Sequence, residues 1–140
     1  MADPNRVVAA AEWLDHVALC GEIVLLEQGR RLFDLTGSEE QQSDFAVPEW
    51  RMAVFASLLL ARLGDERAAV VEQEVAMRNL PASLPRFATH IDLHRGLMLA
   101  RAGDRAGGLA YGRAALGKLP PERHSLTLRR LLAEIEAVAA

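Results

Sequence analysis

Apolar residues recur along the chain at the three- and four-residue spacing of amphipathic helices. Glycine and proline divide this pattern into segments, as they do where helices begin and end. The pattern predicts about seven helices and no strand, over residues 5–19, 21–35, 48–63, 65–78, 86–102, 104–118 and 122–138. One bent helix in place of the first two fits equally well. The apolar set of the final helix is Leu126, Leu128, Leu131, Leu132, Ile135 and Val138.

The 140 residues suit a single all-α domain, 1–140, and the 24 alanines favour helix. We divide the domain into N-terminal helices over 1–36, a loop over 37–48, a first helical pair over 49–81, a second over 86–120 and a C-terminal capping helix over 121–140. The loop is expected to be flexible because it is polar and acidic and lies between Gly37 and Pro48.

A 24-residue segment occurs twice, 39 residues apart. The stretch 58–81 aligns without gaps on 97–120, and each copy contains the end of one helix, a Gly-Asp turn, a second helix and a closing Leu-Pro. A period of this size indicates stacked supersecondary units. The identical pairs are Leu58/Leu97, Leu60/Leu99, Ala61/Ala100, Arg62/Arg101, Gly64/Gly103, Asp65/Asp104, Ala76/Ala115, Leu80/Leu119 and Pro81/Pro120.

The spacing of small residues, apolar residues and a closing proline around each turn resembles that of the tetratricopeptide repeat. These positions are Gly96, Leu99, Gly103-Asp104, Gly108, Ala115-Leu116 and Pro120 in the second copy, and Ser57, Leu60, Gly64-Asp65, Ala69, Ala76-Met77 and Pro81 in the first. The resemblance implies a tetratricopeptide-like array of antiparallel helix pairs. The chain departs from the family in its period, which exceeds the usual length of about 34 residues, and at Gln73 and Gly112, where a bulky apolar residue is usual.

The region from about 50 to 135 is also similar to the C-terminal sensor region of bacterial helix-turn-helix transcriptional regulators. The stretches that carry this similarity are 90–96, 99–104, 114–120 and 128–131. The similarity implies a domain that binds a peptide or protein signal. No DNA-reading helix-turn-helix can be placed in 1–48, so the similarity implies either a sensor domain alone or a protein that has lost its DNA-binding half.

Charge and cysteine content narrow the class of partner. The net charge of −3 argues against direct nucleic-acid binding, although residues 1–48 carry −6 and residues 49–140 carry +3. Cys20 is the only cysteine, so no internal disulfide can form. No signal peptide or membrane-spanning run is visible, which favours a cytoplasmic protein. Apolar faces on the terminal helices favour a homodimer.

The tetratricopeptide resemblance implies a concave groove lined by the first helix of each pair. An apolar floor with a basic rim suits an acidic peptide, a C-terminal carboxylate or an acidic helix, because guanidinium groups bind carboxylates in a bidentate manner. The alternative is that the arginines pair internally with Glu49, Glu66 or Asp92, or are simply solvated. The expected groove residues are Arg51, Val54, Leu58, Arg62, His90, Leu93, Leu97 and Arg101.

His90 and His94 lie four residues apart, so both imidazoles lie on one helix face. A zinc site needs further ligands, and none is close in sequence. We therefore expect no metal, no cofactor and no catalytic residues. The expected function is a protein- or peptide-binding module of a cytoplasmic bacterial regulatory system. Two alternatives stay open: an assembly adaptor without a ligand switch, and a helical metalloenzyme that uses the His90/His94 pair.

Overall fold

The computed structural model describes residues 21–22, 24–32 and 48–140, and every regular element in these ranges is a helix. Residues 21–22 and 24–32 are helical, which agrees with the predicted helix there. The following elements are α2 (Glu49–Leu63), α3 (Glu66–Asn79), α4 (Arg86–Arg101), α5 (Arg105–Gly117), a 3-10 helix η2 (Pro121–Arg123) and α6 (Leu126–Ala139). The all-α prediction is confirmed. The predicted helix over 5–19 and the loop over 37–47 lie outside the described residues.

A glycine ends the first helix of each pair, Gly64 after α2 and Gly103 after α4. Gly64 and Gly103 have φ angles of 71° and 114°, in the region that side chains with a Cβ rarely adopt. The amide of the next residue then bonds back to the helix, from Asp65 N to Leu60 O at 3.1 Å and from Asp104 N to Leu99 O at 2.9 Å. This pattern is typical of helix ends closed by glycine.

The aspartate after each glycine begins the next helix. Asp65 Oδ1 accepts a hydrogen bond from Ala68 N at 3.1 Å, and Asp104 Oδ1 accepts one from Gly107 N at 2.9 Å. Both aspartates act as N-caps. The two copies of the repeated sequence therefore form the same turn with the same bonds.

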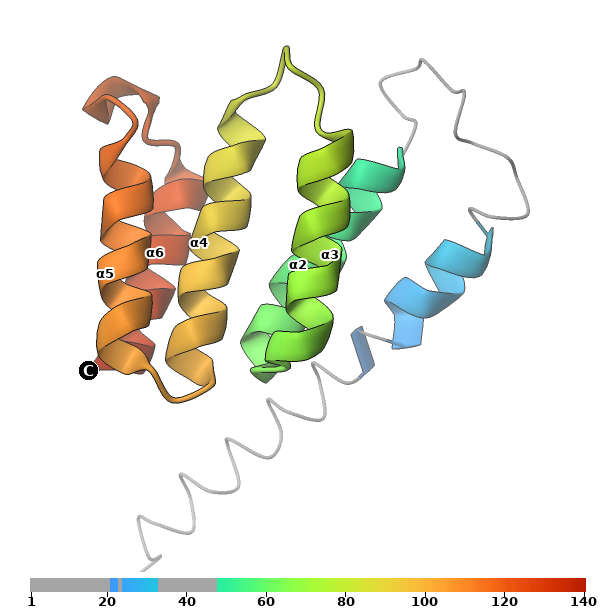
Figure 1. The fold of residues 1–140 in the computed structure, drawn as a ribbon, viewed down its shortest axis with the longest axis horizontal. Coiled ribbons are helices and arrows are strands. Elements are labelled where there is room, and N and C mark those ends of the chain that lie inside the picture. Colours follow the sequence, from blue (N-terminus) through green and yellow to red (C-terminus); the bar gives the residue numbers. More distant parts are fainter. Residues whose placement is uncertain (1–20, 23, 33–47) are drawn as a thin grey trace, which may run out of the picture.

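The helices pack in the order of the repeat (Figure 1). α2 packs against α3, and α4 packs against α5, each pair forming a hairpin around its Gly-Asp turn. α4 also contacts α2 and α3, and α6 contacts α4 and α5 in the same way. α6 thus takes the place that the first helix of a third pair would occupy.

An apolar core joins the helices on their facing sides. One cluster links α4, α5 and α6 through residues that include Leu93, Leu97, Leu128 and Ile135. A second cluster surrounds Trp50, whose ring meets the edge of Phe87 with centroids 5.0 Å apart. Trp50 is part of the core, since it is 7% exposed. Trp13 lies outside the described residues.

Three glycines let α4, α5 and α6 approach closely. A Cβ on Gly108 would lie 2.5 Å from Gly96 O and 2.6 Å from Ala100 N, both backbone atoms of α4. A Cβ on Gly112 would lie 2.8 Å from Ile135 Cδ1 of α6. A Cβ on Gly96 would lie 2.9 Å from Gly108 O, so Gly96 and Gly108 are required by the backbone packing, whereas at Gly112 only the side chain of Ile135 would have to move. The unusual Gly112 leaves the space that Ile135 fills.

The start of the last helix was predicted wrongly. We expected it at Glu122, but residues 121–123 form η2 and α6 begins at Leu126. The physical reason is Ser125, whose hydroxyl accepts a hydrogen bond from Leu128 N at 3.3 Å and caps α6. The preceding prolines, Pro120 and Pro121, hold the chain in a short turn instead.

We expect Gly108→Ala to lower the free energy of unfolding by about 1–3 kcal/mol, because backbone atoms of α4 would have to move to make room. Gly117→Ala is the matched control on the same helix, since a Cβ there meets no atom within 4 Å. This control should be neutral or stabilise the fold by up to about 1 kcal/mol. Urea unfolding followed by circular dichroism measures both. Equal stability of the two variants would contradict the close packing of α4 on α5.

Candidate functional site

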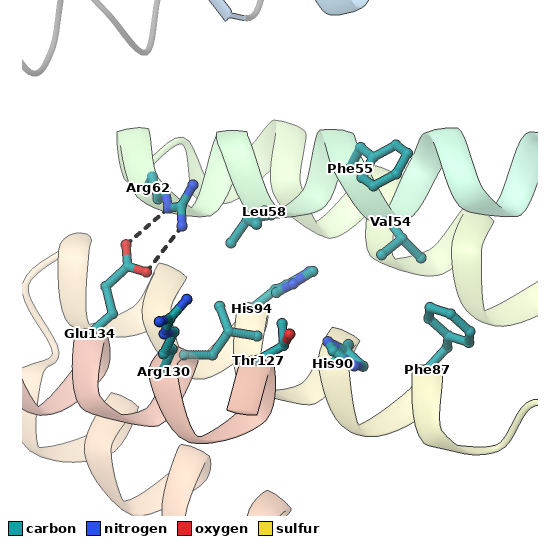
Figure 2. Close-up of a pocket in the computed structure, with 11 residues that line it drawn as sticks. Val54, Phe55, Leu58, Arg62, Phe87, His90, His94, Thr127, Arg130 and Glu134 are labelled. Atoms are coloured by element: carbon teal, nitrogen blue, oxygen red, sulfur yellow. Dashed lines mark hydrogen bonds and ion pairs between the residues drawn. The ribbon is translucent and has the colours of Figure 1, made fainter. Parts of the chain in front are cut away.

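A groove runs between α2, α4 and α6, and we call it the α2/α4/α6 groove (Figure 2). Its cavity volume is about 330 Å³. α2 and α4 are the first helices of the two pairs, and α6 packs on α4 and α5 as α4 packs on α2 and α3. Its lining residues are Val54, Phe55, Leu58 and Arg62 from α2, Phe87, His90 and His94 from α4, and Thr127, Arg130, Leu131 and Glu134 from α6.

The groove is mainly apolar along α2 and at one end. Val54 and Leu131 are buried beneath it, whereas Leu58 is half-buried. Phe55 is 50% exposed, which is unusual for a large aromatic side chain that has an apolar cavity beside it. Figure 2 shows Phe55, Val54 and Phe87 together at the end of the groove away from Arg62.

An ion pair crosses the other end of the groove. Arg62 Nε donates to Glu134 Oε1 at 2.9 Å, and Nη2 donates to Oε2 at 3.2 Å. The pair is bidentate and about one-third exposed, at 33% for Arg62 and 27% for Glu134. Arg62 therefore has an internal partner, but this partner is not one of the expected acids Glu49, Glu66 and Asp92. Glu134 lies 72 residues away, on α6.

His94 forms the polar part of the groove floor. Its Nδ1 lies 3.1 Å from the hydroxyl oxygen of Ser57 on α2, and both residues are buried, at 2% and 0% exposure. Burial, the neighbouring His90 and the charge of Arg62 lower the pKa of His94 to about 3. The imidazole is thus neutral at physiological pH.

Two further groups determine the charge of the groove. His90 is half-buried beside Phe87, with ring centroids 5.6 Å apart, and burial together with Arg86 lowers its pKa. Arg130 is exposed on α6 and makes no hydrogen bond or ion pair with the described residues. Because the charges of Arg62 and Glu134 offset each other, the lining carries one net positive charge, at Arg130.

The structure brings four of the eight expected groove residues together. Val54, Leu58, Arg62 and His90 line the groove.

The other four lie elsewhere. Leu93 and Leu97 of α4 are fully buried, because residues of α6 pack against them. Arg101 is exposed at the end of α4, and its backbone lies against Gly64, outside the groove. Arg51 places its guanidinium 5.2 Å from the ring centroid of Trp50. The basic rim expected from Arg51 and Arg101 is therefore not part of the groove lining.

Sequence reasoning missed the contribution of α6 and the polar floor. α6 was interpreted as a cap, so Thr127, Arg130 and Glu134 were not expected to line the groove. His94 was considered only as a metal ligand. One signal was available: Phe55 and His94 lie 39 residues apart, the same spacing as the repeat, so extending the alignment upstream pairs them as lining positions.

Within the described residues, no three His, Cys, Asp or Glu side chains are grouped so that they could hold a metal ion. The hydrogen bond to Ser57 engages Nδ1 of His94, which leaves a single ring nitrogen for any ligand. Helices long and apolar enough to cross a membrane are also absent from these ranges.

No protein-family model, curated protein or solved structure matches the chain. The likeness to tetratricopeptide repeats and to regulator sensor regions therefore rests on the residues that carry it.

We expect His94 to make stability depend on pH. Its folded pKa lies below the value of 6.5 that applies to the unfolded chain. As pH falls below 6.5, His94 therefore binds a proton in the unfolded state but stays neutral in the folded state. Stability is lost by on the order of 1 kcal/mol per pH unit as pH falls toward 3.

The test compares wild type with the double variant Ser57→Ala/His94→Phe, which removes both members of the buried hydrogen bond and leaves no orphaned partner. Urea unfolding is measured in steps from pH 6.5 down toward pH 3. The double variant should show a shallower loss of stability, while His90 acts equally in both proteins. The same slope in both would show that His94 is not held neutral by the fold.

Proposed function

We propose that this chain is a non-catalytic module that binds a peptide segment of a partner protein in the α2/α4/α6 groove. One observation carries the proposal: the groove joins three helices and exposes apolar surface that nothing in the described part of the chain covers. Phe55 is the main example, at 50% exposure beside the cavity. Grooves between helices are common sites for peptide recognition.

The size of the groove sets the size of what it holds. A volume of about 330 Å³ is near the lower end for ligand pockets, which span roughly 300–1,000 Å³. This space suits one or two apolar side chains of a peptide whose backbone runs along the opening. Phe55, Leu58 and Phe87 would supply the contact area.

Charge favours a peptide that is mainly apolar. Arg62 is already paired with Glu134, so it does not act as a free cation for a partner's carboxylates. An acidic residue of the partner would contact Arg130 at the rim. A peptide with an apolar core and one acidic flank fits this lining better than a peptide that is acidic throughout.

The wider role rests on resemblance. A peptide-binding module similar to regulator sensor regions would serve as the partner-sensing part of a cytoplasmic bacterial regulatory system. Occupancy of the groove would be sensed through the packing of α2 and α6, because both walls move if the groove widens. An adaptor would bind the same peptide without this response.

The test is selection of peptides from a random phage-displayed library on the full chain, followed by affinity measurement with purified variants. Phe55→Ser should weaken binding of the selected peptides by roughly tenfold or more, since burial of a phenyl ring is lost. Val71→Ser is the matched control, because Val71 is similarly exposed at 56% but lies on α3 and does not line the groove.

Two results would contradict the proposal. One is a failure to select any peptide on the folded chain. The other is a set of selected peptides whose affinity falls equally with Val71→Ser and Phe55→Ser, which would place binding outside the groove.

A further inference from the structure

The buried pair Ser57–His94 holds one histidine tautomer at the groove floor. The Ser57 hydroxyl is fully buried, and among the described residues its only hydrogen-bond partner is Nδ1 of His94. A buried hydroxyl hydrogen needs an acceptor, and Nδ1 is the acceptor present. Ser57 therefore donates to Nδ1, and the proton of the neutral ring is on Nε2.

The Nε2–H group has no partner within the described part of the chain, because the one hydrogen bond of the ring uses Nδ1. Nε2 is also not fully enclosed. Among the described residues, the one side-chain nitrogen or oxygen that is both fully enclosed and without a partner is Gln73 Oε1, so the unpartnered Nε2 of His94 must retain some accessible surface. His94 lines the groove, so Nε2–H reaches the open space there. The floor thus offers one buried, oriented hydrogen-bond donor.

The charged and titratable side chains that line the groove around this donor come from all three helices. Arg62 comes from α2, His90 from α4, and Arg130 and Glu134 from α6. Glu134 is the only acceptor of these that carries a charge, and it is engaged by both nitrogens of Arg62. Nε2–H therefore has no acceptor among the described residues.

We propose that His94 Nε2–H donates a hydrogen bond to a main-chain carbonyl of the bound peptide, and that this peptide is extended where it crosses His94. Carbonyls within a helix are already bonded to their own backbone, so a helical peptide offers free carbonyls only in its last turn, whereas an extended peptide can offer one wherever it crosses His94. A neutral carbonyl suits the site better than a carboxylate, because a charge buried on this floor would need a compensating cation. Arg62 is already paired, and Arg130 is exposed at the rim. The inference rests on the proposed groove and specifies what the groove recognises.

The first test needs no ligand. Nitrogen-15 shifts of the imidazoles in the full-length, isotopically labelled chain distinguish the two neutral tautomers and the protonated ring. We expect His94 as the neutral Nε2–H tautomer at neutral pH. The opposite tautomer, with the proton on Nδ1, would overturn the inference, since Nε2 would then be an acceptor.

The second test uses an N-acetylated, C-amidated peptide from the phage selection, with the methyl signals of Leu58 and Leu131 as reporters of groove occupancy. Ser57→Ala/His94→Phe should lower its affinity by about two- to tenfold, the worth of a neutral hydrogen bond. The shifts at Leu58 and Leu131 should remain, because the apolar contacts are kept. Circular dichroism checks that the double variant is as helical as wild type.

Failure of the inference and failure of the proposed function give different results. If the wild-type methyl signals shift but the double variant binds equally well, the groove stands and His94 is not its polar contact. Protonation of His94 on binding would show a carboxylate at the floor and would also overturn the inference. If the peptide binds without shifting either methyl signal, the groove itself is wrong, and the inference falls with it.

Discussion

The close approach of α4 and α5 at Gly96 and Gly108 is the constraint on which the rest of the structure depends. A Cβ at Gly108 would meet backbone atoms of α4, so no other residue fits there without moving a helix. This approach places Gly112 beneath α6 and lets Ile135 pack into the space. α6 is thereby held beside α4, where it forms the third wall of the α2/α4/α6 groove. The groove is thus a consequence of helix packing in the second pair.

Differences between the two copies create the chemistry of the site. Ser57 stands where the second copy has Gly96, and its hydroxyl bonds to His94 instead of leaving room for a backbone. Phe55 and His94 are equivalent by the repeat spacing, yet one is an exposed aromatic ring and the other a buried imidazole. Because a neutral imidazole and an exposed phenyl ring lie on neighbouring helices, the groove combines an apolar wall with one oriented donor.

Local sequence determined what could be predicted. The Gly-Asp turns, the aspartate caps and the ends of α2, α3, α4 and α5 depend on residues within one turn of each other, so their patterns are visible in the sequence. The start of α6 was missed because the apolar pattern does not show where the helix begins. The cap at Ser125, just after η2, sets that start. The partner of Arg62 was missed for another reason: Glu134 is 72 residues away, and only the packing of α6 on α4 brings it near. The same packing buries Leu93 and Leu97, which repeat alignment alone placed in the groove.

The central claim is that α2, α4 and α6 form one peptide-binding surface. A crystal structure of the full chain with a selected peptide tests it most directly. The account predicts an extended peptide between α2 and α6, with an apolar side chain against Phe55 and Leu58 and a backbone oxygen within hydrogen-bond distance of His94 Nε2. A peptide bound on the outer surface of α3 and α5, with the groove empty, would contradict it.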